Sequence, residues 1–267
     1  MEAMTSRVRI GVQIQPQHSP DYALIRDAVR RAEDIGVDIA FNWDHFYPLH
    51  GEPDGAHFEC WTMLGAWAEQ TERIEFGPLV TCNSYRNPDL LADMARTVDH
   101  ISGGRVILGV GSGWFERDYT EYGYDFGTAG SRLDALGEAL PRIETRFSKL
   151  NPAPTRKIPL LIGGGGERKT LRHVAAHADI WHSFVDVETY RRKSAILAEH
   201  CAAVGRDASS IERSAELKGR TNTDDLLRFA DDITAEGVSL LTYAVNGPDY
   251  DLSTVKRLIE WRDAREG

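Results

Sequence analysis

The stretch VRIGVQIQPQHSPDYALIRDAVRRAEDIGVDIAFNWD, residues 8–44, contains a complete strand–helix–strand unit. Its apolar residues predict a buried strand over 8–15, a helix over 21–35 and a second strand over 39–44. The middle segment repeats its apolar residues at helical spacing, and Asp21 stands where an N-terminal cap is expected. Parallel strands joined by helices are buried on both faces, which explains why both strand segments are almost continuously apolar.

The same alternation continues along the rest of the chain and gives eight strand–helix pairs. Further strands are expected at 75–82, 105–110, 158–162, 180–184, 214–217 and 239–245. Eight such pairs in 267 residues match a (β/α)8 TIM barrel, and we expect a single domain over residues 1–267. A doubly wound open sheet is the alternative. Such a sheet usually carries a glycine-rich turn after its first strand, and residues 13–20 contain no glycine.

Composition and charge argue against several classes of protein. The chain has 31 Lys and Arg against 41 Asp and Glu, a net charge of −10, and it has no basic block. Nucleic acids and anionic membranes are therefore not expected as partners. No apolar run reaches the roughly 18 residues of a membrane span, and no secretory leader is evident, so a cytoplasmic protein is expected. Cys60, Cys82 and Cys201 lie far apart, so neither disulfides nor a metal site is expected.

The candidate functional residues follow the predicted strands, because the active sites of TIM barrels lie at the carboxyl ends of their strands. Those expected there are Gln13, Gln15, His18, Asp44, His45, Thr81, Asn83, Ser84, Arg86, Ser112, Trp114 and Glu116. Asp44 and His45 end an apolar strand, where a carboxylate can orient a donor and a histidine can exchange protons near neutral pH. The alternative is that both side chains only satisfy backbone groups of the loop.

Two glycine-rich segments also follow predicted strands. Gly163 to Gly166 precede a helix and could bring backbone N–H groups against a phosphate, although a tight turn explains them equally well. Arg168 and Lys169 favour an anion, whereas Glu167 is also explained as a charge that suits the first turn of a helix. The segment 109–113 lacks the spacing of a dinucleotide fingerprint and instead favours close approach of the backbone to a flat ring.

Taken together, these features resemble the luciferase-like monooxygenase superfamily, in particular its branch that uses the deazaflavin coenzyme F420. The resemblance rests on the segments 32–36 (AEDIG), 44–46 (DHF), 71–74 (TERI), 86–88 (RNP), 99–105 (DHISGGR), 109–114 (GVGSGW) and 162–167 (IGGGGE). Each segment is weak evidence alone, and their order and positions relative to the strands make the set specific.

The resemblance implies a flavin-type ring at the carboxyl ends of the strands, with the coenzyme's tail phosphate at the four glycines. Family members commonly carry a non-proline cis peptide in the third strand, and the matching stretch here runs from Leu79 to Thr81. Asp44 would hydrogen-bond the ring or its ribityl chain, and His45 would transfer the proton. The implied coenzyme-binding residues are Asp44, Leu79, Val80, Thr81, Gly111, Ser112, Gly113, Gly163, Gly164, Gly165, Gly166 and Glu167.

The chain also departs from the family pattern. Some F420-dependent dehydrogenases carry a carboxylate in the glycine segment after the fourth strand, where this chain has Ser112. Glu116 is the candidate to replace it as a catalytic group. The chain has little room for the large insertion that covers many family members' sites, so segments 46–58 and 115–130 are the expected cover. Candidate substrate contacts are His18, Glu59, Asn83 and Trp114.

We therefore expect an oxidoreductase that moves a hydride between F420 and a small organic substrate. A deazaflavin reacts poorly with oxygen, and the coenzyme supplies the chemistry while the protein orients it. One alternative is a monooxygenase that uses reduced FMN and oxygen. Another is a barrel that binds a coenzyme without turnover. The resemblance further implies a homodimer that pairs through helices near the second to fourth strands.

Overall fold

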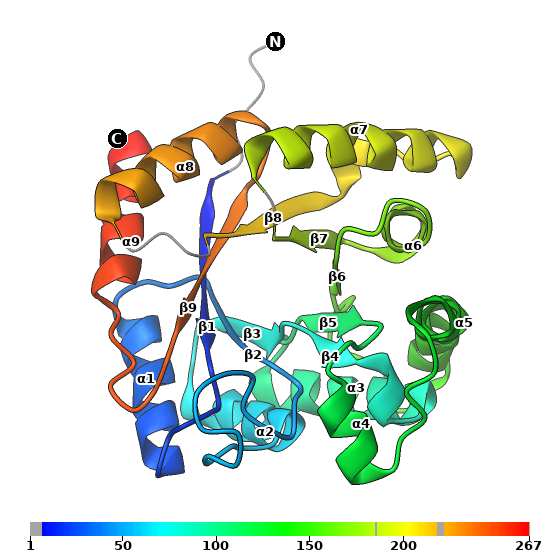
Figure 1. Ribbon diagram of the computed structural model, residues 1–267, viewed down its shortest axis with the longest axis horizontal. Helices are drawn as coiled ribbons and strands as arrows, with labels where there is room; N and C mark the ends of the chain where they lie inside the picture. The colour runs from blue at the N-terminus through cyan, green and yellow to red at the C-terminus, as the bar shows by residue number, and fades with distance from the viewer. Residues whose placement is uncertain (1–6, 185, 218–221, 267) are drawn as a thin grey trace.

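The computed structural model describes residues 7–184, 186–217 and 222–266, and within them strands surround the centre while helices lie outside (Figure 1). The strands described are β1 (Arg9–Ile14), β2 (Ile39–Asn42), β3 (Glu75–Pro78), β4 (Thr81–Cys82), β5 (Leu108–Gly111), β6 (Leu160–Gly163), β7 (Ile180–Ser183), β8 (Glu212–Glu216) and β9 (Leu240–Val245). The α-helices described are α1 (Tyr22–Asp34), α2 (Cys60–Gln70), α3 (Pro88–Ser102), α4 (Glu116–Tyr122), α5 (Ala129–Lys149), α6 (Thr170–His177), α7 (Val187–Ala203), α8 (Thr223–Ala235) and α9 (Ser253–Glu266). Short 3-10 turns cover Asn83–Tyr85 and Ala208–Ser210.

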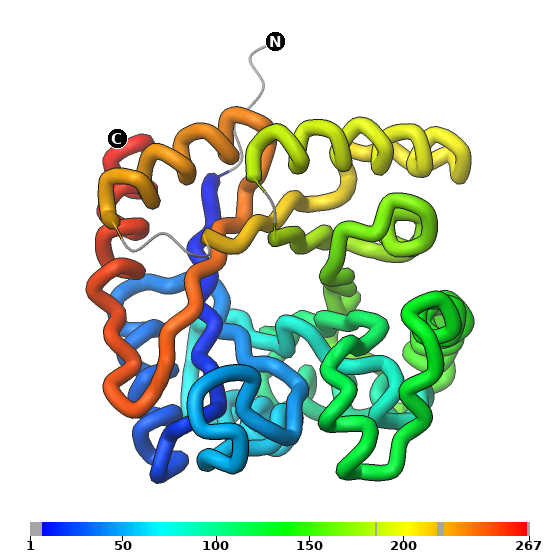
Figure 2. Tube along the Cα trace, viewed as in Figure 1, coloured from blue at the N-terminus to red at the C-terminus, as the bar shows by residue number. Residues whose placement is uncertain are grey.

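The strands form one parallel sheet that closes on itself. Its order is β3-β2-β1-β9-β8-β7-β6-β5-β4, so the first and last strands lie side by side (Figure 2). At the remaining edge, the Phe76 N–H donates to the Arg105 carbonyl at 3.1 Å, and the Ile107 N–H donates to the Phe76 carbonyl at 2.8 Å. Because β3 and β4 together take the place of one strand, the nine described strands fill eight positions. The predicted (β/α)8 barrel is confirmed.

The third strand is interrupted, which the apolar run over 75–82 did not indicate. The expectation of one continuous strand there is wrong, because β3 ends at Pro78 and β4 begins only at Thr81. The Leu79–Val80 peptide between them is cis, as the family resemblance predicts. Gly109 of β5 permits this arrangement, because a Cβ at that position would lie 2.0 Å from the Pro78 carbonyl oxygen.

Two apolar layers hold the barrel together. The inner layer fills the barrel itself and consists of Ile39, Phe41, Leu79, Ile107, Leu161, Ile180 and Leu240, with Val80 packed on it. The outer layer lies between the strands and the helices; in α1, for example, Ile25 and Val29 are buried at helical spacing. Burying each large apolar side chain contributes about 1.5–3 kcal/mol. Asp21 caps α1 as predicted, because its carboxylate accepts the Ala23 N–H at 2.9 Å.

Two charged side chains, Glu33 and Arg105, hold the backbone together at the amino end of the barrel. The Glu33 carboxylate accepts the backbone N–H groups of Glu72, Arg73 and Ile74 at 3.0, 2.5 and 2.9 Å. Burial opposes ionisation of Glu33, but these donors prevail and lower its pKa. Arg105 donates to the Ala68, Thr71 and Ile74 carbonyls at 2.8–2.9 Å. The segments 32–36, 71–74 and 99–105 therefore serve the fold and lie away from the carboxyl ends of the strands.

One helix was not expected from the sequence. The segment 115–130 contains α4, whose seven residues end at Gly123 in a left-handed conformation with φ 72°. Its buried anchors are Asp118 and Tyr119, one polar and one aromatic, so no apolar stripe reveals it. No helix within the described ranges combines the length and apolar character needed to cross a membrane.

Acid should destabilise the fold through His182, which is fully buried in β7 with Nδ1 2.8 Å from the Ser214 hydroxyl. Burial lowers the pKa of His182 to about 3. The unfolded chain takes up this proton near pH 6.5, so acidification favours unfolding by about 1.4 kcal/mol per pH unit below about pH 6. Urea denaturation between pH 7 and pH 4 should show a steeper loss for the wild type than for His182→Gln.

The exposed His100 provides the control, since His100→Gln should keep the wild-type dependence on pH. Equal slopes for the wild type and His182→Gln would contradict the assignment of this acid sensitivity to His182.

Candidate active site

A cavity of about 680 Å³ opens at the carboxyl ends of the strands. Its volume is in the range of small-molecule and coenzyme sites. The predicted site residues that line it are Gln13, Gln15, Asp44, His45, Leu79, Val80, Gly111, Ser112, Gly113, Trp114, Gly163 and Gly164. Cys82, Tyr85 and Phe184 are among the other lining residues. The structure thus gathers the ends of β1, β2, β4, β5, β6 and β7 around one space.

Several predicted residues lie outside the lining of this cavity. They are His18, Glu59, Thr81, Asn83, Ser84, Arg86, Glu116, Gly165, Gly166 and Glu167. His18 turns to the backbone of the covering loop, with Nε2 2.6 Å from the His50 carbonyl. Glu59 caps α2 by accepting the N–H groups of Trp61 and Thr62, and Thr81 accepts the Trp61 indole N–H at 3.0 Å. Glu116 is exposed at the start of α4.

One wall of the cavity is built around Val80. A Cβ on Gly111 would lie 2.7 Å from a methyl of Val80, and one on Gly163 would lie 3.0 Å from its other methyl. A Cβ at either position would crowd Val80, and glycine lets both strands lie close to it. The Gln13 side-chain amide donates to the Leu79 carbonyl at 3.0 Å, which fixes the start of the interruption between β3 and β4.

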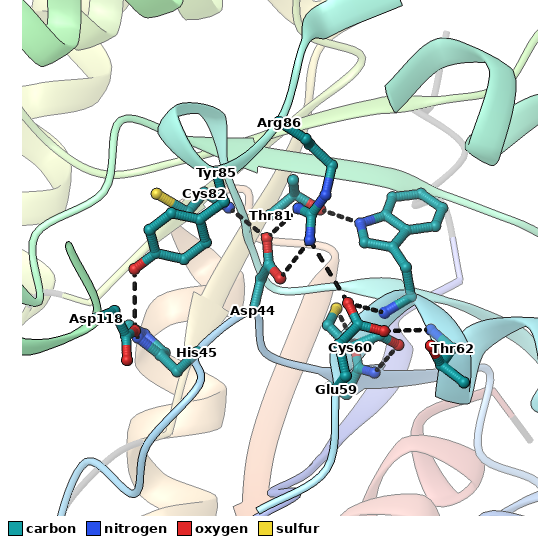
Figure 3. Close-up of polar contacts among 12 residues, drawn as sticks. Asp44, His45, Glu59, Cys60, Thr62, Thr81, Cys82, Tyr85, Arg86 and Asp118 are labelled. Carbon is teal, nitrogen blue, oxygen red and sulfur yellow. Dashed lines mark hydrogen bonds and ion pairs between the residues drawn. The ribbon is translucent and has the colours of Figure 1, made fainter. Parts of the chain in front are cut away.

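Asp44 fixes the other end of the interruption. Its carboxylate accepts the Cys82 N–H at 2.9 Å and makes a bidentate ion pair with Arg86 at 2.5 and 3.0 Å. Figure 3 shows the Arg86 guanidinium between Asp44 and Glu59, whose Oε1 lies 3.5 Å away. Burial works against the charge on Arg86, but Asp44 outweighs it and the pKa of Arg86 is raised. Asp44 therefore enters the cavity wall as a carboxylate that already has a cationic partner.

His45 has a different partner, the fully buried Asp118 of α4. Nδ1 of His45 lies 2.7 Å from Oδ2 of Asp118, and the Tyr85 hydroxyl donates to the same oxygen at 2.9 Å. The Phe46 N–H donates to the other oxygen of Asp118 at 3.1 Å. In Figure 3, His45 and Tyr85 both point at this carboxylate from different segments. Burial, followed by the charges nearby, raises the pKa of Tyr85, which keeps its hydroxyl a donor.

Aromatic rings surround the His45 imidazole. Trp43, Trp114 and Phe115 meet it edge-on, with ring centroids 5.9, 5.7 and 5.5 Å away. The Trp43 indole N–H in turn donates to Nε2 of His57 at 3.0 Å. Burial lowers the pKa of His57 to about 4, so this ring is neutral at physiological pH and can accept that bond. The imidazole of His45 is thereby held on its edges as well as through Nδ1.

Sequence reasoning missed Asp118 and Tyr85. Asp118 lies two residues beyond Glu116, within a helix that the sequence did not reveal. Tyr85 was hidden among the polar residues after the third strand, because its role depends on a contact 33 residues away. The one clue in the sequence was Ser112, which stands where some members of the family have a carboxylate. It directed attention to carboxylates in the segment that follows, which contains Asp118.

The four-glycine loop lies beside the cavity and has a lysine above it. A Cβ on Gly165 would lie 2.5 Å from Nζ of Lys193, which reaches the loop from α7. The Gly164 N–H donates to the His182 carbonyl at 3.0 Å and belongs to the sheet rather than to a phosphate site. Glu167 pairs with Arg192, and Lys169 pairs with Asp134. The sequence singled out the loop, and the structure adds Lys193, whose ammonium group lies against Gly165.

The sequence is similar to known proteins, and one family profile matches most of the chain. The profile of the luciferase-like monooxygenase family matches residues 4–219. The chain belongs to this family. An uncharacterized protein of Mycobacterium tuberculosis is 30% identical over 188 residues, which are 64% of this chain and 65% of that protein. An F420-dependent glucose-6-phosphate dehydrogenase of Amycolatopsis mediterranei is 27% identical over 233 residues, covering 79% and 68% of the two chains.

Solved structures confirm the fold of this family member. An F420-dependent secondary alcohol dehydrogenase in complex with an F420-acetone adduct superposes with a TM-score of 0.85 at 16% identity. The superposition covers 96% of this chain and 99% of that one. The chain is therefore nearly coextensive with a solved barrel of the same architecture, although it spans only about two thirds of the curated relatives above.

Replacing Arg86 by methionine should strongly destabilise the protein, because Asp44 would be left as a buried carboxylate without its cation. Breaking a buried ion pair in this way costs about 3–5 kcal/mol. Urea denaturation followed by both tryptophan fluorescence and circular dichroism measures the loss. The double variant Asp44→Asn/Arg86→Met should recover part of it, since the uncompensated charge is then removed.

The exposed pair of Arg142 with Asp89 supplies the control, and Arg142→Met should cost less than about 1 kcal/mol. A loss that small for Arg86→Met would show that the ion pair does not hold the end of the interrupted strand.

Proposed function

We propose that this protein is an F420-dependent oxidoreductase that moves a hydride between the coenzyme and a small organic substrate. The observation that carries the proposal is the composition of one cavity, in which the imidazole of His45 shares the lining with the Val80 wall. One side offers a surface without polar side chains for a flat ring. The other offers a group that can exchange a proton.

The residues present fit this coenzyme. Gly111 and Gly163 leave the face over Val80 free of side chains, so a planar ring can approach it closely. Lys193 lies over Gly165 at the edge of the same site, where an ammonium group suits a phosphate. When bound, the deazaflavin would supply the hydride acceptor or donor.

The relatives support the same coenzyme. Both the glucose-6-phosphate dehydrogenase and the structurally similar secondary alcohol dehydrogenase carry F420 in their names. Their substrates differ, one a sugar phosphate and the other an alcohol. We extend the coenzyme to this chain and assign it hydride transfer with an alcohol or carbonyl compound as the general class of substrate.

His45 handles the proton in this proposal. Its Nδ1 is bonded to Asp118, so the other ring nitrogen, Nε2, is the one that meets a substrate. In the oxidising direction, an alcohol passes its hydroxyl proton to Nε2 as the carbonyl forms. In the reducing direction, the protonated ring returns that proton to the carbonyl oxygen. A positioned acid or base of this kind typically contributes about 10²- to 10⁴-fold in rate.

Coenzyme binding is tested by fluorescence titration of the purified protein with F420 and, in parallel, with FMN at matched salt. Tight binding of F420 is expected, and Lys193→Met should weaken it about tenfold or more by removing the cation near the phosphate. Lys157→Met is the control, because Lys157 is exposed and precedes β6 at the amino end of the barrel. Preference for FMN would favour the monooxygenase alternative, and binding of neither would refute the proposal.

Turnover is tested with a panel of small alcohols and carbonyl compounds, following the absorbance of F420. His45→Ala should lower kcat/KM by roughly 10²- to 10⁴-fold while the dissociation constant of F420 changes less than about threefold. The exposed His100 provides a matched control in His100→Ala. Wild-type turnover by His45→Ala would remove His45 from the mechanism.

A further inference from the structure

We infer that Asp118 and Tyr85 are positioning residues that fix the tautomer and orientation of His45, leaving Nε2 free to exchange a proton with the substrate. This inference rests on the proposed function. It assigns a positioning role in the same proton transfer to two side chains that act through His45.

The contacts of the Asp118 carboxylate carry the inference. The side chain is fully buried and accepts the Phe46 N–H and the Tyr85 hydroxyl, in addition to its contact with His45. A carboxylate is an acceptor, so the nitrogen 2.7 Å from it holds the proton. A neutral imidazole has only one N–H, and Nε2 of His45 is therefore the unprotonated nitrogen.

The charges around the ring favour the same assignment. Within the described part of the chain, His45 is the one ion-pair partner recorded for Asp118. Asp44, the nearest carboxylate on the same segment, is neutralised by Arg86. His57 faces His45 from the loop before α2 and is neutral above its low pKa. Asp118 is thus placed to stabilise the imidazolium that forms when Nε2 takes up a proton.

Tyr85 holds the Asp118 carboxylate in place. Its hydroxyl shares Oδ2 of Asp118 with His45, so the carboxylate is held from a second side and cannot rotate away without losing both bonds. The Tyr85 ring packs on Phe46 with centroids 4.7 Å apart, which fixes the residue next to His45. Burying a carboxylate costs free energy unless its oxygens are paired, and an apolar side chain would fill the same space without that cost. Packing alone therefore does not explain Asp118.

The tautomer is tested directly by two-bond ¹H–¹⁵N correlation spectra of the imidazoles, with the His45 signal identified by its loss in His45→Gln. Neutral wild-type His45 should carry its proton on Nδ1. In Asp118→Asn, the amide N–H can donate to Nδ1, and the proton should move to Nε2. A wild-type ring protonated on Nε2 would overturn the inference. This measurement needs no substrate, and it needs His45→Gln to fold only so that the signal can be assigned.

Kinetics give the second test. Asp118→Asn should lower kcat by roughly 10²- to 10⁴-fold with F420 affinity unchanged within about threefold, and it should shift the pH profile of kcat/KM. Tyr85→Phe should lower kcat by about 3- to 10-fold and keep the tautomer. Glu121→Gln is the control on the same helix, since Glu121 is exposed.

The outcomes separate this inference from the proposed function. If the wild type binds F420 and turns over substrate while Asp118→Asn keeps wild-type kcat and pH profile, the positioning role is wrong and the function stands. If the wild type neither binds F420 nor turns over, the function fails, and the spectra still decide whether Asp118 fixes the ring.

Discussion

The interruption of the third strand between Pro78 and Thr81 is the constraint on which the rest of the site depends. A strand that breaks inside a closed parallel sheet leaves backbone groups that the regular ladder no longer pairs, and buried polar groups need partners. Gln13 supplies one for the Leu79 carbonyl, and Asp44 supplies one for the Cys82 N–H. A buried carboxylate in turn requires a cation, which explains why Arg86 lies where it does. The wall of the cavity and the buried ion pair of Asp44 with Arg86 thus have a common cause.

The same two segments that pair these backbone groups also build the proposed proton-transfer group. Asp44 is followed by His45, and Arg86 is preceded by Tyr85. One pair of neighbours, Asp44 with Arg86, closes an ion pair that holds the backbone. The other pair, His45 with Tyr85, meets at the Asp118 carboxylate. His45 follows Asp44 and Tyr85 precedes Arg86, so the ion pair of Asp44 with Arg86 also sets the distance between His45 and Tyr85. Asp118 binds across that distance, and the ion pair that holds the backbone therefore also positions the imidazole.

The fold was predictable from the sequence because it depends on local periodicity, which the strand and helix segments show almost everywhere. Asp44 and His45 were predictable for the same reason, since they end a strand and the carboxyl ends of barrel strands converge. Asp118 and Lys193 were not. Asp118 reaches His45 over 73 residues of sequence from a helix with no apolar stripe, and Lys193 reaches Gly165 from α7. Contacts of this kind follow from how separate elements pack, and a single sequence does not record that packing.

Contacts of two neighbouring residues join the loop after β2 to α4. Arg117 donates to the Pro53 carbonyl at 2.6 Å and stacks on the Tyr47 ring at 3.9 Å, which fastens the loop after β2 to α4. Its neighbour Asp118 binds the side chain of His45 and the backbone of the next residue in that loop. Displacing α4 would therefore release the loop after β2 and remove the Nδ1 partner of His45 together. In this barrel, the position of the loop after β2 and the orientation of the His45 imidazole depend on the same short helix.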